Sequence, residues 1–142
     1  IKKGDPYQWQ VEQSVNKIVE NLDYDNLDWI LSYQSRVGPL KWIGPSTDTI
    51  IIKYSKEGKN LVIVPIAFVS EHSETLVELD IEYKEMADEM GYKHYFRSES
   101  LNIDSVFIDS LAEIVTKSDQ SNNENIAEKI CPTTFKRCYQ QI

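Results

Sequence analysis

A histidine and a row of glutamates follow an apolar stretch in the segment 64–83 (VPIAFVSEHSETLVELDIEY). The row consists of Glu74, Glu78 and Glu82, and His72 precedes it by two residues. Carboxylate and imidazole groups bind hard or borderline metal ions, and they also accept protons. Open α/β sheets bind ligands beyond the carboxyl ends of their strands, which is where this polar turn would lie. We therefore take the segment as a candidate site for metal binding or proton transfer.

The elements that must position these residues are predicted to alternate between helix and strand. Periodicity and capping residues predict helices over 5–22, 46–58, 73–90 and 106–116, and strands over 29–33, 60–68 and 92–97. The segment 46–58 is ambiguous, because the isoleucines at 50–52 favour a strand whereas both ends favour a capped helix. We choose the helix, since strands then alternate regularly with helices. This order predicts an α/β fold in three layers, with a parallel sheet flanked by helices.

The chain is predicted to comprise one α/β unit and a polar tail. Its 142 residues are enough for one domain, which we place at residues 1–116. Residues 117–142 are predicted to be a polar linker and a tail that contains Cys131 and Cys138. Three strands are few for this architecture, and no initiator methionine is present. We therefore expect a fragment that is incomplete at its N-terminus.

The composition limits the partners and the compartment. A net charge of −8 repels phosphate backbones, so we expect no nucleic-acid partner. No apolar stretch reaches the length of about 18 residues that a membrane span requires, although a peripheral contact with the inner membrane stays open. Two cysteines in a chain of this length indicate a reducing compartment, and we expect a cytoplasmic protein.

The helix predicted over 73–90 carries two stripes of side chains. One stripe is apolar and is expected to face the core: Leu76, Leu79, Tyr83, Met86 and Met90. The other stripe is acidic: Glu74, Glu78, Glu82, Glu85 and Glu89. One interpretation of the acidic stripe is a solvated surface. The other is a functional row, which a local i→i+5 turn would straighten.

Several motifs resemble those of the ferrochelatase family. The longest is the segment 65–83, and it is accompanied in the family's order by 4–7 (GDPY), 33–42 (YQSRVGPLKW) and 99–102 (ESLN). The resemblance covers about residues 2–116 and implies the C-terminal half of an enzyme with two similar α/β halves around a porphyrin cleft. The implied activity is that of a lyase in heme biosynthesis. It inserts ferrous iron into protoporphyrin IX, gives protoheme as the last step and releases two protons.

The resemblance also implies roles for individual side chains. By matching position, Glu74 is the carboxylate near the inserted metal and His72 is a proton acceptor. Glu78 and Glu82 continue the row as an iron path or a proton exit, so all four residues are candidate metal ligands. Trp42 matches an aromatic residue that contacts the macrocycle, although it could instead anchor its own loop. The family also has a widened helix at this row, in agreement with the geometric hypothesis.

Two features of the family are not matched by this chain. The upstream catalytic histidine is absent, so we expect the missing N-terminal half to be a partner and this fragment alone to be inactive. Some members bind a [2Fe–2S] cluster through four cysteines, whereas Cys131 and Cys138 supply two, so we expect no cluster.

Two other functions fit the same residues. A chelatase for another metal or tetrapyrrole would use similar ligands, because selectivity among such metals depends on geometry and availability. A non-catalytic α/β module would instead present the acidic helix for docking to partner proteins. The resemblance favours the iron chelatase over both.

Overall fold

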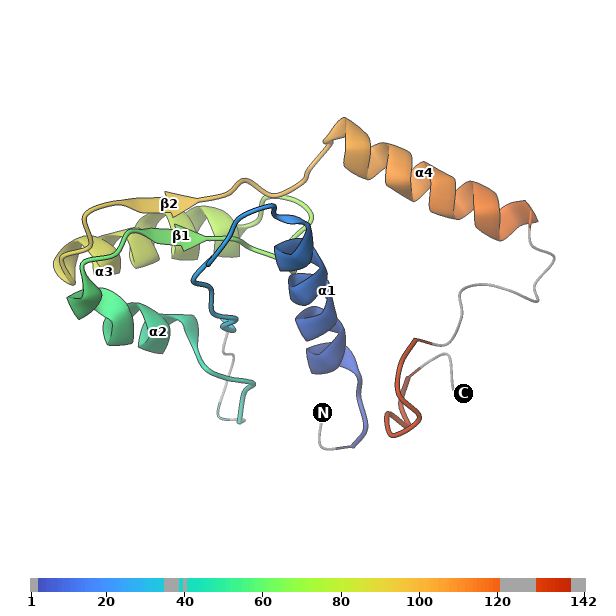
Figure 1. The fold of residues 1–142 in the computed structure, drawn as a ribbon, viewed down its shortest axis with the longest axis horizontal. Helices are drawn as coiled ribbons and strands as arrows, with labels where there is room; N and C mark the ends of the chain where they lie inside the picture. The colour runs from blue at the N-terminus through green and yellow to red at the C-terminus, as the bar shows by residue number, and fades with distance from the viewer. Residues whose placement is uncertain (1–2, 35–38, 40, 121–129, 139–142) are drawn as a thin grey trace. The chain divides into compact units, whose positions relative to one another are not determined.

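The computed structural model describes residues 3–34, 39, 41–120 and 130–138 (Figure 1), with the backbone alone for 118–120. Its elements are α1 (Tyr7–Asn21), α2 (Thr47–Tyr54), the 3₁₀-helix η1 (Ser55–Glu57), β1 (Leu61–Ile63), the π-helix η2 (Glu74–Glu82), α3 (Tyr83–Glu89), β2 (Tyr95–Arg97) and α4 (Ser105–Gln120). The chain divides into two compact units, residues 15–100 and residues 1–14 with 101–142, and each is described by itself. The candidate site lies in the unit 15–100.

Strands β1 and β2 form a parallel pair. Leu61 lies opposite Tyr95, and Ile63 lies opposite Arg97. Parallel strands need a crossover connection, which the continuous helix η2–α3 provides here. Figure 1 shows this helix running alongside the two strands, with α2 beside α3. The predicted α/β class with a parallel sheet is confirmed.

Both strands are shorter than predicted. β1 ends at Ile63 rather than at residue 68, because Pro65 has no N–H to continue the ladder. β2 begins at Tyr95 rather than at residue 92, because the Tyr92 N–H still donates to the Ala87 carbonyl (3.0 Å) at the end of the preceding helix. The turn into the candidate site therefore begins earlier than the apolar sequence predicts.

The strand predicted over 29–33 is reduced to one parallel bridge between Tyr33 and Ser46. The Tyr33 N–H donates to the Pro45 carbonyl (2.9 Å), and the Thr47 N–H donates to the Tyr33 carbonyl (3.2 Å). Pro45 lacks an N–H and α2 begins at Thr47, so the pairing does not extend into a strand. In the described part of the chain the sheet has two strands instead of the three predicted.

A small apolar core joins α2, α3 and the sheet. Ile51 and Ala87 are almost fully buried, and they pack with Tyr92. Four half-buried side chains complete this cluster: Leu61, Tyr83, Met86 and Tyr95. The Tyr92 hydroxyl donates to the Ile51 carbonyl at 2.7 Å, which satisfies a polar atom inside the core. This core holds α3 against the sheet and so fixes the helix that continues from the candidate site.

The helix chosen over 46–58 is confirmed. Ile51 points into the core at 1 % exposure, whereas Ile52 is 52 % exposed, as expected for one face of a helix. The helical segment ends where Gly58 adopts a left-handed conformation, with φ at 66°.

The other unit contains α4 and the cysteine tail. Helix α4 continues to Gln120, so the predicted boundary at residue 116 falls inside a helix, and 117–120 are helical rather than linker. The rest of the predicted linker, 121–129, lies outside the described residues. Cys131 and Cys138 are both buried, and the Gln10 side-chain amide donates to the Cys131 sulfur at 3.6 Å. Among the described helices, none combines the length and the apolar composition that crossing a membrane demands.

Candidate functional site

The acidic row lies on a π-helix, so the predicted widened turn is confirmed. This helix, η2, spans nine residues. At its end the Tyr83 N–H donates to the carbonyl of Glu78, five residues back, where an α-helix would use that of Leu79. Steps of four residues overshoot a full α-helical turn by about 40°, and the wider π turn offsets this drift. The side chains at positions 74, 78 and 82 therefore follow one line along the helix more closely.

The π geometry also changes which side chains reach the core. Thr75 and Leu79 are fully buried, whereas Leu76, which was predicted to face the core, is 48 % exposed. Met90, which was also predicted to face the core, is 38 % exposed. The apolar stripe was predicted with 3.6 residues per turn, and the prediction fails at Leu76 because the wider turn rotates that position outward.

The three carboxylates of the row act on one another electrostatically. Glu74 and Glu78 are half-buried and Glu82 is exposed. Burial raises the pKa of Glu78, and the negative charges of Glu74 and Glu82 raise it further. The middle carboxylate of the row therefore takes up a proton more readily than an ordinary glutamate does.

His72 stands at the beginning of the row. Its ring stacks on Phe68, with the ring centroids 5.7 Å apart and the planes inclined by 18°. The Glu74 N–H donates to the His72 Nδ1 at 3.3 Å, which joins the imidazole to the first turn of η2. The structure thus brings His72 and Glu74 together, as the sequence predicts.

Arg97 joins the candidate site to β2, and the sequence analysis missed this residue. Its Nε and Nη2 donate to the two carboxylate oxygens of Asp80 at 2.5 and 2.7 Å, and its Nη1 donates to Glu71 at 3.0 Å. Glu71 also accepts from the Thr75 hydroxyl (2.6 Å) and from the Ser100 N–H (2.9 Å). These contacts, the Thr75 bond first, hold the pKa of Glu71 at about 2. In the sequence, the signal for Arg97 was an arginine that stands alone at the end of a predicted strand, the strand that pairs with β1.

Tyr95 is a second contact from β2 that the sequence analysis missed. Its hydroxyl donates to the Leu79 carbonyl, inside η2, at 2.6 Å. Burial raises the pKa of Tyr95 to about 12, so the hydroxyl keeps its proton and remains a donor at neutral pH.

A preformed metal cage is not found in the part of the chain that the structure describes. There, no three side chains of the types His, Cys, Asp and Glu lie close enough together to hold one ion. His72, Glu74, Glu78 and Glu82 therefore form a linear series of donors rather than a coordination cluster.

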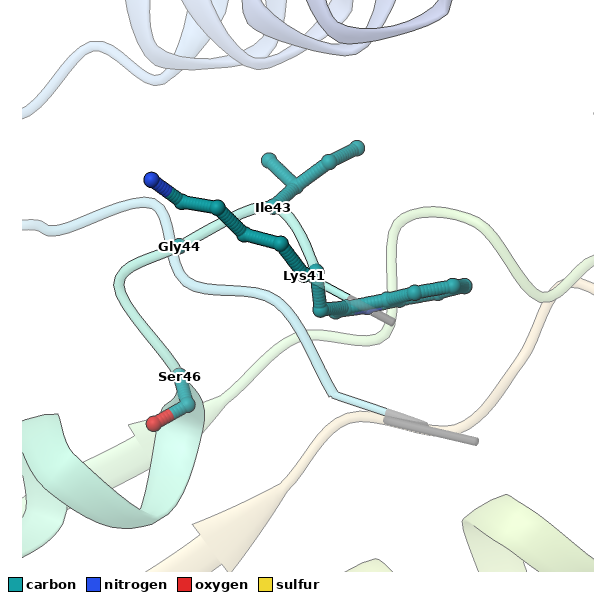
Figure 2. A pocket seen from close by; sticks show the side chains of 5 residues that line it. Lys41, Ile43, Gly44 and Ser46 are labelled. Atoms are coloured by element: carbon teal, nitrogen blue, oxygen red, sulfur yellow. The ribbon is translucent and has the colours of Figure 1, made fainter. Parts of the chain in front are cut away.

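Trp42 lies in the loop that leads into α2. Its indole N–H donates to the Gln34 carbonyl at 3.1 Å, and its side chain is 44 % exposed. A shallow hollow of about 240 Å³ is lined by Lys41, Trp42, Ile43, Gly44 and Ser46. Figure 2 shows Lys41, Ile43, Gly44 and Ser46 following one another around this hollow. Trp42 thus anchors its loop and still exposes part of its ring.

The fold and the site together define an α/β protein in which a histidine follows a parallel strand and directly precedes a π-helix that carries a row of carboxylates. The family model described as ferrochelatase matches residues 1–119. The chain belongs to the ferrochelatase family.

Curated relatives support this assignment. The chain is 64 % identical to a ferrochelatase of Pelagibacter ubique over 97 % of its length. It is 46 % identical to a ferrochelatase of Rickettsia prowazekii over 97 % of its length, and 54 % identical to one of Wolbachia pipientis over 80 %. It spans 41 % of the Pelagibacter protein and 42 % of the Rickettsia protein, which is about two-fifths of these relatives.

Proposed function

We propose that this chain supplies the acidic wall of a ferrochelatase that inserts ferrous iron into protoporphyrin IX. The observation that carries the proposal is the π-helix, which aligns Glu74, Glu78 and Glu82 and begins beside His72. Such a reaction needs oxygen and nitrogen donors that hold iron loosely, because the ion has to be passed on. It also needs bases for the two pyrrole protons. The row offers both kinds of group.

The proposed roles follow from position along the row. Glu74 and His72 act at the macrocycle, where they accept protons and contact the entering iron. Glu78 and Glu82 extend this line toward solvent, and their carboxylates offer successive oxygen ligands to the iron substrate or a path for the released protons. The raised pKa of Glu78 suits a group that takes up and releases a proton. Trp42, with its exposed ring, contacts the flat macrocycle.

The proposed partners complete the enzyme. Since the chain spans about two-fifths of its relatives, we propose that a second α/β half closes the porphyrin site. We place the reaction in the cytoplasm, since two cysteines in a chain of this length indicate a reducing compartment.

The tail does not fit a [2Fe–2S] cluster by itself. Such a cluster takes four cysteine or histidine ligands, whereas Cys131 and Cys138 provide two. Burial raises the pKa of Cys131, which favours the neutral thiol over the thiolate that binds metal. We therefore propose no cluster on this chain and no step that uses one.

Iron insertion by the full-length protein tests the proposal. Glu74→Gln removes the carboxylate at the start of the row, and we expect kcat to fall by about 100-fold, the scale of a lost acid–base group. Glu85→Gln is the matched control, because Glu85 is an exposed carboxylate on α3, beyond the end of η2. Anaerobic assays with ferrous iron and protoporphyrin IX measure both variants. Equal rates for Glu74→Gln and the wild-type protein would contradict the proposed role of the row.

A further inference from the structure

The Tyr95 hydroxyl bonds to the Leu79 carbonyl, and the partner of this carbonyl differs between an α-helix and a π-helix. In an α-helix the Tyr83 N–H would donate to the carbonyl of Leu79, four residues back. Here the Tyr95 hydroxyl donates to that carbonyl at 2.6 Å. The Tyr83 N–H donates instead to the Glu78 carbonyl.

We propose that Tyr95 is a positioning residue for iron insertion, because its hydroxyl selects the π register of η2 and so keeps the acidic row in line. The register part of this inference follows from the structure, and its effect on iron rests on the proposed function. Tyr95 bonds to η2 through its side-chain hydroxyl. It acts through the main chain at Leu79, next to Glu78.

The alternation of side chains along β2 supports this role of Tyr95. Tyr95 and Arg97 are two residues apart on β2, so their side chains lie on the same face. Both are half-buried and both bond to η2, whereas Phe96 between them is 57 % exposed. Arg97 reaches Asp80, the residue after Leu79. Two successive residues of the π-helix are therefore held by one short strand.

π-Helices are rare, and they need support from outside the helix when an α-helix competes for the same residues. The Tyr95 hydroxyl supplies that support by donating to the Leu79 carbonyl in place of the Tyr83 N–H, which in the π register bonds to Glu78 instead. The bidentate Arg97–Asp80 pair also fixes the orientation of η2 relative to β2, because a guanidinium and a carboxylate bind each other in one plane. Loss of the hydroxyl frees the Leu79 carbonyl for α-helical bonding.

The test compares Tyr95→Phe with Tyr92→Phe in the full-length protein. Tyr92 is a matched control, because its hydroxyl donates to the Ile51 carbonyl at 2.7 Å within the same core but away from η2. We expect both variants to lose similar thermal stability. We expect Tyr95→Phe alone to raise the KM for ferrous iron several-fold while the KM for porphyrin stays unchanged. Equal iron KM values for the two variants would overturn the inference, since a merely structural bond would affect both alike.

A crystal structure of Tyr95→Phe separates this inference from the proposed function. We expect the Tyr83 N–H to shift to the Leu79 carbonyl and η2 to shorten. If η2 keeps its nine π-helical residues, the inference fails whatever the activity. If the wild-type protein inserts no iron, the proposed function fails, and the variant structure still decides the register.

Discussion

Glu71 and Glu78 are seven residues apart and have opposite electrostatic environments. Glu71 accepts bonds from Thr75, Ser100 and Arg97, which favour its charged form. Glu78 is partly buried between two carboxylates, which favours its neutral form. The first residue therefore anchors the loop, whereas the second is suited to exchange a proton.

Glu71→Gln is expected to reduce the acid sensitivity of folding. The folded-state pKa of Glu71 is about 2, below its ordinary value of 4.5. Its charge therefore stabilises the fold fully above pH 4.5, and this contribution is lost as the pH falls toward 2. Urea unfolding of the full-length protein over a series of acidic pH values measures the slope. Parallel curves for the variant and the wild type would show that these bonds contribute nothing to stability.

Glu78→Gln is expected to stabilise the protein at neutral pH. A raised pKa means that the charged form is disfavoured in the fold, so the cost is present above that pKa and disappears as Glu78 becomes protonated in acid. Like charges four residues apart on a helix cost about 0.2–0.5 kcal/mol per pair, so we expect a gain of about 0.5 kcal/mol. Thermal unfolding at neutral and acidic pH checks this, with Glu99→Gln, an exposed carboxylate, as control. A loss of stability at neutral pH would contradict it.

At the scale of the element, η2 depends on β2 as well as on its own sequence. The helix begins two residues after His72, whose ring stacks on Phe68, and it is held by bonds from Tyr95 and Arg97. These bonds cross 16 and 17 residues of sequence, so the relative position of strand and helix decides whether they form. The acidic row is thus positioned by the whole βαβ unit.

Arg97→Gln is expected to destabilise the full-length protein by about 2 kcal/mol, the scale of hydrogen bonds to charged groups. The side chain of Arg97 is 9 % exposed, so its loss leaves Asp80 and Glu71 without their counter-charge. Lys84→Gln is the control and should cost about 0.5 kcal/mol or less, the scale of a surface pair. Lys84 pairs with Asp88 at 2.7 Å, with both side chains more than half exposed. Equal free energies of unfolding would show that the Arg97 pair is no stronger than a surface one.

At the scale of the whole molecule, one face of the two-stranded sheet in the unit 15–100 is exposed. Val62 and Phe96 lie opposite each other in the parallel pair and are 60 % and 57 % exposed. The relatives are more than twice as long as this chain, which covers 41 % of the Pelagibacter protein. This coverage supports the proposal that a second α/β half closes the porphyrin site.

Residues 1–142 expressed alone are expected to show no measurable iron insertion. The row is proposed to supply one wall of the porphyrin site, and we propose that the rest of the full-length protein supplies the second wall. Anaerobic assays of this chain and of the full-length protein, at equal concentration, measure the difference. Robust turnover by this chain alone would show that the second half is dispensable.

Local patterns predicted the features that depend on neighbouring residues. The helix over 46–58, the parallel βαβ order and the widened turn at the acidic row are all confirmed, because caps, periodicity and charge spacing act over a few residues. The prediction of a strand over 29–33 was wrong. Strand pairing depends on the partner segment, and Pro45 in that segment has no N–H to donate. The prediction that Leu76 is buried was also wrong, because the wider π turn rotates this position outward.

The sequence by itself determined the identity and order of the site residues, since His72, Glu74, Glu78 and Glu82 lie within one continuous segment. The tertiary structure alone decided what holds them, because Tyr95 and Arg97 reach η2 only when β2 pairs in register with β1. That pairing directs a hydroxyl onto one carbonyl and a guanidinium onto the next residue. The residues that can do the chemistry lie close together in the sequence. Their alignment depends on contacts between residues that are distant in the sequence.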